Sequence, residues 1–166
     1  MANFVYHKDE ENGSKKSTVV MGVGNLLLKD EGVGIHVVQA LQDSPLLTNV
    51  PVKVIDGGTS PDVVHLLDGT DKLIVIDAVK GGGHPGSIYR FQANDVPMEA
   101  NISTSLHQIG LLDTLNMMEC IGSKPKDVVI IGVETKEIDW GLELSPELEQ
   151  KIPQIIRVVL QELGRG

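Results

Sequence analysis

The chain has 166 residues, a formal net charge of −9 from 23 acidic and 14 basic residues, and a single cysteine, Cys120. An acidic chain without a basic stripe repels phosphate backbones, which argues against nucleic acid as a partner. One cysteine excludes an intramolecular disulfide and a cysteine-rich zinc site, and no apolar run is long enough to span a membrane. Since no signal peptide precedes the first strand, the expected location is the cytoplasm.

The first residues differ in character from the rest of the chain. Residues 1–16 are mostly polar, and residues 8–16 carry no periodic apolar pattern. This composition predicts a flexible N-terminal extension without a function of its own. No repeat or long linker follows, so residues 17–166 are expected to form a single domain.

Strand and helix patterns then alternate along the chain. In chain order, strands are expected over residues 18–22, 52–55, 73–76, 87–91 and 128–133. Helices are expected from Asp30, as N-cap, to about residue 41, over residues 61–67, and from about residue 104 to 120. A last apolar stripe runs from Leu148 to Leu163, and Pro153 marks either a helix start or a kink within it.

This alternation predicts an α/β fold, a three-layer α/β/α sandwich with a mostly parallel twisted sheet. Residues 73–76 are continuously apolar, as in a strand that is buried on both faces. Residues 87–91 are more amphipathic and are expected to form an antiparallel edge strand.

Potential metal ligands lie where strands end or helices begin. Glu31 begins a helix, Asp77 follows the strand of residues 73–76, and His107 lies in the first turn of another helix. In an α/β fold these ends gather along one edge of the sheet. Two carboxylates and one imidazole can therefore meet and bind a divalent ion with coordination positions left open. A structural role is the alternative for each: helix capping for Asp30-Glu31, loop capping for Asp77, and a surface position for His107.

Two glycine-rich segments end strands at the same edge. In Asp56-Gly-Gly-Thr59, the Asp56 carboxylate either orients a water or substrate group or hydrogen-bonds its own turn, and the sequence does not decide between the two. Gly22-Val-Gly-Asn-Leu-Leu27 partly matches the dinucleotide-binding fingerprint but has leucine at the third glycine position. Its glycines are more typical of a tight loop that carries Asp30 and Glu31 to the sheet edge.

Taken together, these motifs resemble those of the hydrogenase maturation endopeptidases, which trim the C terminus of the nickel-iron hydrogenase large subunit. The resemblance covers residues 18–163 and depends on five motifs. They are Gly22-x-Gly-Asn-x-Leu-x-x-Asp-Glu-Gly-x-Gly34, Asp56-Gly-Gly-Thr59, Ile76-Asp-Ala78, Ser105-x-His-Gln-x-Gly-Leu111 and residues 139–146. The sequence departs from the family pattern at Leu106 and Thr135, where prolines are common.

The resemblance implies a peptidase that acts in the cytoplasm as a monomer, with the large-subunit precursor as partner and no membrane or nucleic acid involved. It implies that Glu31, Asp77 and His107 contact nickel that the substrate carries, and that Asp56, Glu31 and Asp77 serve catalysis. Two alternatives remain: a nickel-sensing chaperone that binds the large subunit without cutting it, and a small nucleotide-dependent enzyme.

Overall fold

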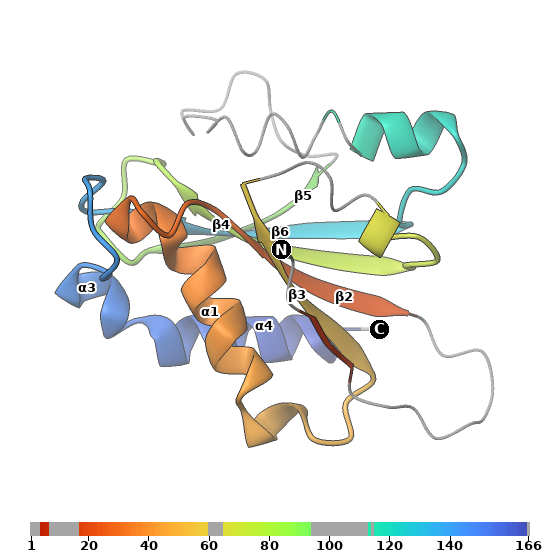
Figure 1. Cartoon of the computed structure of the whole chain (residues 1–166), viewed down its shortest axis with the longest axis horizontal. Coiled ribbons are helices and arrows are strands. Elements are labelled where there is room, and N and C mark those ends of the chain that lie inside the picture. Colours follow the sequence, from red (N-terminus) through yellow and green to blue (C-terminus); the bar gives the residue numbers. More distant parts are fainter. Residues whose placement is uncertain (1–3, 7–16, 60–64, 94–112, 114, 166) are drawn as a thin grey trace.

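The computed structural model describes residues 4–6, 17–59, 65–93, 113 and 115–165 (Figure 1). Within these residues, six strands form one sheet in the order β1-β3-β2-β4-β6-β5. Their bounds are β1 (Phe4–Tyr6), β2 (Thr18–Val23), β3 (Val52–Gly58), β4 (Lys72–Val79), β5 (Ile88–Gln92) and β6 (Asp127–Glu134). The four central strands are parallel, and β1 and β5 are antiparallel at the two edges. The mostly parallel sheet and the antiparallel edge strand near residues 87–91 are confirmed.

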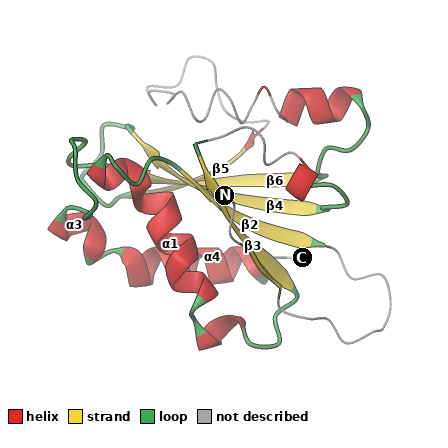
Figure 2. Ribbon diagram, viewed as in Figure 1, coloured by secondary structure: helices red, strands yellow, loops and turns green. Residues whose placement is uncertain are grey.

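Helices cover both faces of the sheet (Figure 2). On one face, α1 (Val33–Gln42) and α4 (Ile152–Leu163) share an apolar core with the strands. On the other, Leu115 and Met118 from the helical residues 115–120 pack with Leu67 against the sheet. Short helices η1 (Lys29–Gly32), η2 (Pro45–Leu47) and α3 (Pro146–Glu149) lie between the main elements. The predicted three-layer sandwich is confirmed.

The core is built around β4, in which all eight residues are buried. Successive side chains of a strand point to opposite faces. Ile74, Ile76 and Ala78 accordingly join the core beneath α1 and α4, whereas Leu73 and Val75 join the core on the other face. By the same alternation, Asp77 belongs to the face that residues 115–120 cover.

The N-terminal segment departs from the prediction. Phe4–Tyr6 forms β1, which pairs with β3 through residues 53–55, so a flexible extension over residues 1–16 is wrong for these three residues. The physical reason is the β-prone sequence Phe-Val-Tyr, which pairs the backbone groups that β3 would otherwise leave open at the sheet edge. Residues 1–3 and 7–16 lie outside the described residues.

Two helix boundaries also differ. The turn η1 precedes α1, which begins at Val33 without a side-chain cap, so the prediction that Asp30 is its N-cap is wrong. The C-terminal stripe is divided into α3 and α4, and Pro153 lies in the first turn of α4, which makes it a helix start rather than a kink. Residues 61–64 of the expected helix over residues 61–67 lie outside the described residues, and residues 65 and 66 have 3-10 conformation. Most of the expected helix from residue 104 also lies outside the described residues. No helix in the described part of the chain is long and apolar enough to cross a membrane.

Candidate functional site

The loop between β2 and α1 brings Glu31 to the carboxyl edge of the sheet. Its last residues form η1, which packs against β4. Gly24 permits this path, because its φ is 145° and a Cβ there would lie 2.1 Å from the carbonyl oxygen of Glu31. The Gly24 amide donates to the carbonyl oxygen of Gly58 at 3.0 Å and so joins the loop to the end of β3. The glycines therefore shape a loop that carries Asp30 and Glu31, and the backbone of Glu31 already occupies the space beside Gly24.

Asp30 is the most heavily hydrogen-bonded side chain of this loop. It is 0% exposed and accepts four hydrogen bonds from the segment of residues 136–145. Its Oδ2 accepts from the amides of Lys136 (2.9 Å) and Glu137 (2.8 Å) and from the hydroxyl of Ser145 (2.8 Å). Its Oδ1 accepts from the amide of Ser145 at 2.7 Å. Asp30 thus fastens residues 136–145 to the turn that carries Glu31.

Further contacts join the same two segments. The Lys29 amide donates to the carbonyl oxygen of Gly141 at 2.9 Å, and the Asp30 amide donates to that of Glu137 at 3.2 Å. The Lys29 ammonium lies 2.5 Å from a carboxylate oxygen of Glu137, and this hydrogen bond raises the pKa of Lys29. The turn that carries Glu31 and residues 136–145 are therefore held together by several hydrogen bonds and an ion pair.

Asp77 lies within β4, which continues to Val79, rather than directly after the strand as the sequence suggested. It is 1% exposed, and its Oδ1 accepts from the amide of Ala78 at 2.8 Å. The residue in register with Asp77 on β6 is Gly132. Gly132 has no side chain, and the space above it is taken by Val79, whose two Cγ atoms would lie 2.8 and 2.9 Å from a Cβ at Gly132.

Asp56 lies at the same edge, separated from Asp77 by β2. Gly22 of β2 is in register with Asp56 on one side and with Ile76 on the other. Alternation places Asp56 on the face of Val54, beneath α1, whereas Asp77 belongs to the opposite face. The Asp56 Oδ1 accepts from the amide of Gly58 at 3.0 Å, so the role in its own turn, one of the two alternatives, is present.

Glu134 is a buried carboxylate that was not among the predicted site residues. It ends β6, and its Oε2 accepts from the Gly81 amide at 2.7 Å and from the Tyr89 hydroxyl at 3.0 Å. Burial and the Glu134 carboxylate raise the pKa of Tyr89. A sequence signal was present, because Glu134 follows the apolar run of residues 128–133 as Asp77 follows that of residues 73–76. Glu134 anchors the loop that follows the end of β4 at Val79.

The structure thus brings Glu31, Asp56 and Asp77 to one edge of the sheet from three different elements. His107, the third predicted metal ligand, lies outside the described residues. Within the described residues, no three histidine, cysteine or acidic side chains cluster closely enough to hold a metal ion. The predicted metal contacts of Glu31, Asp77 and His107 therefore stay a prediction.

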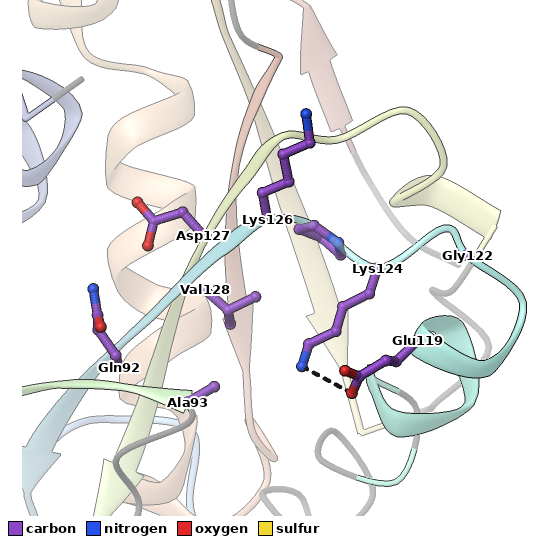
Figure 3. A pocket seen from close by; sticks show the side chains of 9 residues that line it. Gln92, Ala93, Glu119, Gly122, Lys124, Lys126, Asp127 and Val128 are labelled. Carbon is purple, nitrogen blue, oxygen red and sulfur yellow. Dashed lines mark hydrogen bonds and ion pairs between the residues drawn. The ribbon is translucent and has the colours of Figure 1, made fainter.

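A hollow of about 400 Å³ lies at the opposite edge of the sheet (Figure 3). The end of β5, the start of β6 and the loop of residues 122–126 line it, and Lys124 pairs with Glu119 at its rim. Since β6 begins at Asp127, the hollow is at the amino end of the parallel strands. Ligands of open α/β sheets bind at the carboxyl end, so the hollow is separate from the candidate site.

Known proteins resemble this chain in sequence and in fold. The family model for hydrogenase maturation proteases matches residues 35–162. The hydrogenase expression/formation protein HupD of Thiocapsa roseopersicina is 35% identical over 157 residues, which is 92% of this chain and 70% of that protein. The hydrogenase 2 maturation protease of Escherichia coli is 32% identical over 147 residues, 87% of this chain and 89% of that protein. Among solved structures, the hydrogenase maturating endopeptidase HybD of Escherichia coli superposes with a TM-score of 0.79 and 30% identity, over 90% of this chain and 93% of that one.

The sheet order, the glycine-shaped loop and the acids at the carboxyl edge define an α/β protein with a candidate site at the strand ends. The family-model match over most of the chain shows that it belongs to the hydrogenase maturation protease family. It is accordingly a peptidase.

Proposed function

We propose that this peptidase removes a C-terminal peptide from the nickel-loaded large-subunit precursor of a nickel-iron hydrogenase. It does so in the cytoplasm and as a monomer. Membership of the family supports the reaction class, and the relatives are named for hydrogenase maturation. The observation that carries the proposal is the buried carboxylate of Asp77 in β4, beside Gly132, with the turn of Glu31 packed on the same strand.

Nickel enters this proposal as part of the substrate rather than as a cofactor of the enzyme. Glu31 and Asp77 supply carboxylate oxygens, and His107 supplies an imidazole nitrogen. Nickel accepts both kinds of ligand together. An ion already bound by the precursor completes its coordination with these side chains, so the precursor is recognised only after the metal has been inserted.

The chemistry that follows is hydrolysis of one peptide bond. The metal contact fixes the precursor so that the scissile carbonyl lies near the carboxyl edge of the sheet. A water molecule, held by the ion or by the Asp56 carboxylate, adds to the carbonyl carbon, and the C–N bond breaks as the released amine takes up a proton. The Asp56 carboxylate retains Oδ2 for this purpose while Oδ1 accepts from the Gly58 amide.

The test is intact-mass analysis of a nickel-loaded large-subunit precursor incubated with the protein, beside a nickel-free precursor. We expect loss of a C-terminal peptide only from the nickel-loaded form. Glu31→Gln, Asp77→Asn and His107→Ala should each slow cleavage on the order of 100-fold or more, since loss of even an indirect support of a metal ligand costs 10- to 100-fold. Glu149→Gln, at an exposed acid of α3, is the matched control and should cleave normally.

Two results would contradict parts of this proposal. Cleavage that is equally fast without nickel would support the peptidase activity on the precursor and contradict its recognition through nickel. Nickel-dependent complex formation without cleavage would favour the chaperone alternative. Asp56→Asn separates these cases further, because a binding module does not need a carboxylate to orient water and would keep its full function.

A further inference from the structure

Exposed apolar side chains gather beside the turn that carries Glu31. The sole tryptophan of the chain, Trp140, is 76% exposed, and Leu142 two residues later is 64% exposed. Ile138 precedes them on the same segment, and Leu27 lies across from it at 53% exposure. We call these four residues the Trp140 patch. A tryptophan held in water is unusual, because its large ring gains most from burial, and exposed apolar patches mark interaction sites.

Backbone hydrogen bonds fix the two segments of the patch relative to each other. Leu28 and Gly141 form a parallel β-bridge, in which the Gly141 amide donates to the Leu27 carbonyl oxygen at 2.9 Å. The register of this bridge places Leu27 alongside Trp140. The four hydrogen bonds of Asp30 hold the same segment from its buried side. The patch is therefore preorganised, which lowers the entropic cost of binding.

Acidic side chains surround the apolar ones. Glu137, Asp139 and Glu143 are exposed and alternate with Ile138, Trp140 and Leu142 along the segment. Glu137 is paired with Lys29, so Asp139 and Glu143 carry the charge available to a partner. Charged groups at the rim of an interface steer a partner of opposite charge. A fitting partner therefore presents an apolar segment with basic residues beside it.

We propose that the Trp140 patch is the docking surface for the hydrogenase precursor and binds an apolar, base-flanked segment of it. The inference rests on the proposed function. The patch is hydrogen-bonded to the turn of Glu31, so a polypeptide held at the carboxyl edge of the sheet extends across it. Tryptophan at such a centre carries a large share of binding energy.

The test compares the steady-state cleavage kinetics of two variants on a nickel-loaded large-subunit precursor that the wild-type protein cleaves. Trp140→Ala should raise KM on the order of tenfold or more, with kcat little changed. Ile121→Ala is the matched control, because Ile121 is 70% exposed but lies beside the hollow at the opposite edge of the sheet, and its KM should equal that of the wild type. Raising the salt concentration should increase the wild-type KM, since the rim acids would be screened.

The outcomes separate the two proposals. If the wild type does not cleave the precursor, the proposed function fails. If the wild type cleaves but Trp140→Ala has an unchanged KM, or a lower kcat alone, the docking surface is overturned and the proposed function stands. Sedimentation of both proteins without precursor gives a further criterion. A wild-type dimer that Trp140→Ala converts to monomer would show that the patch binds a second copy instead.

Discussion

Asp30 and Glu31 are neighbours in the chain, and their side chains serve different parts of the molecule. Glu31 lies on the turn at the sheet edge. Asp30 points inward to partners between Lys136 and Ser145, which come 106 to 115 residues later in the chain. Local sequence favoured a helix cap because acids are common at helix starts. The true partners are three backbone amides and a hydroxyl, and no local pattern marks such a distant set.

Replacing the Asp30 carboxylate tests this fastening. In Asp30→Asn the amide nitrogen must face groups that are all hydrogen-bond donors, so we expect a loss of roughly 2–3 kcal/mol in the free energy of unfolding. Because Trp140 is the sole tryptophan, its fluorescence reports directly on the segment, and the emission should change in the folded variant. Denaturant titration followed by fluorescence and by circular dichroism measures both effects.

Ser145→Ala provides the graded control for Asp30→Asn. It removes one hydroxyl donor and leaves the three amides bound to the carboxylate. The expected cost is about 1 kcal/mol with unchanged tryptophan emission. Equal stability of Asp30→Asn and the wild type would show that the segment is held by its other contacts.

Other site residues were predictable to different degrees. Glu31, Asp56 and Asp77 could be placed at one edge from the sequence, because parallel strands end together. The face of the sheet to which each carboxylate belongs could not be predicted, since a shift of one residue at a strand end reverses the direction of a side chain. Glu134 was missed although it follows an apolar strand, because its partners Gly81 and Tyr89 come from other parts of the chain.

At the scale of elements, the contact between α1 and the sheet fixes the site. Gly34 in the first turn of α1 lies so close to β2 and β4 that a Cβ there would be 2.2 Å from the Ile76 carbonyl oxygen and 2.6 Å from that of Val23. The neighbouring strand residue Gly22 leaves equally little space, because a Cβ on Gly22 would lie 2.2 Å from the Gly34 carbonyl oxygen. The distance between the turn of Glu31 and the end of β4 is thus set by backbone contact.

A methyl group at this position should separate the two elements. We expect Gly34→Ala to lose on the order of 3 kcal/mol in unfolding free energy, at the upper end for overpacked sites, because the obstructing atoms are backbone atoms that cannot rotate away. Gly164→Ala is the control, since its Cβ would meet only ordinary contacts at 3.5 Å or more. Chemical denaturation of both variants measures the difference, and similar stabilities would show that α1 can shift without cost.

The sequence predicted α1 and its buried face correctly and missed the turn η1 before it. Apolar spacing indicates which residues face the core, but it does not distinguish a 3-10 turn from the first turn of a helix. The division of the C-terminal stripe into α3 and α4 has the same origin. Both helices follow one apolar stripe, and the break falls where Pro153 sets the start of α4.

At the scale of the whole molecule, Glu162 joins three elements of one face. It is 2% exposed in α4 and accepts from Lys72 of β4 at 3.1 Å and from Arg90 of β5 at 2.6 Å. Lys72 also donates to the carbonyl oxygen of Arg165, at 2.7 Å. The hydrogen bond with Arg90, followed by those with Lys72, lowers the pKa of Glu162 to about 2, against the pull of burial in the other direction.

This lowered pKa makes stability depend on acid pH. The folded state binds the Glu162 proton less tightly than the unfolded state, whose glutamate titrates near 4.5. The stabilisation is therefore complete above that pH and decreases as the pH falls toward about 2, by up to about 3 kcal/mol. Comparing the wild type with Glu162→Gln by thermal unfolding across this range should show a smaller pH dependence in the variant. Parallel curves would mean that other carboxylates dominate acid unfolding.

The architecture was the part best predicted from sequence. Alternating strands and helices with short connections permit few folds besides a layered sheet, and the fully apolar run of β4 identified the centre. The strand β1 was missed because it has only three residues and precedes a polar stretch, so composition averaged over residues 1–16 concealed it.

The two rarest side chains of the chain suggest a way to observe the molecule in action. Cys120 is the single cysteine and is exposed, as Trp140 is; Cys120 ends the helical residues 115–120, whereas Trp140 lies on the segment of residues 136–145. An acceptor dye coupled to the Cys120 thiol would make a resonance-energy-transfer ruler with tryptophan as donor, without any engineered residue. Residues 115–120 follow the chain segment that contains His107. The transfer efficiency would therefore report, in real time, any displacement of that helix relative to the Trp140 patch when the nickel-loaded precursor is added.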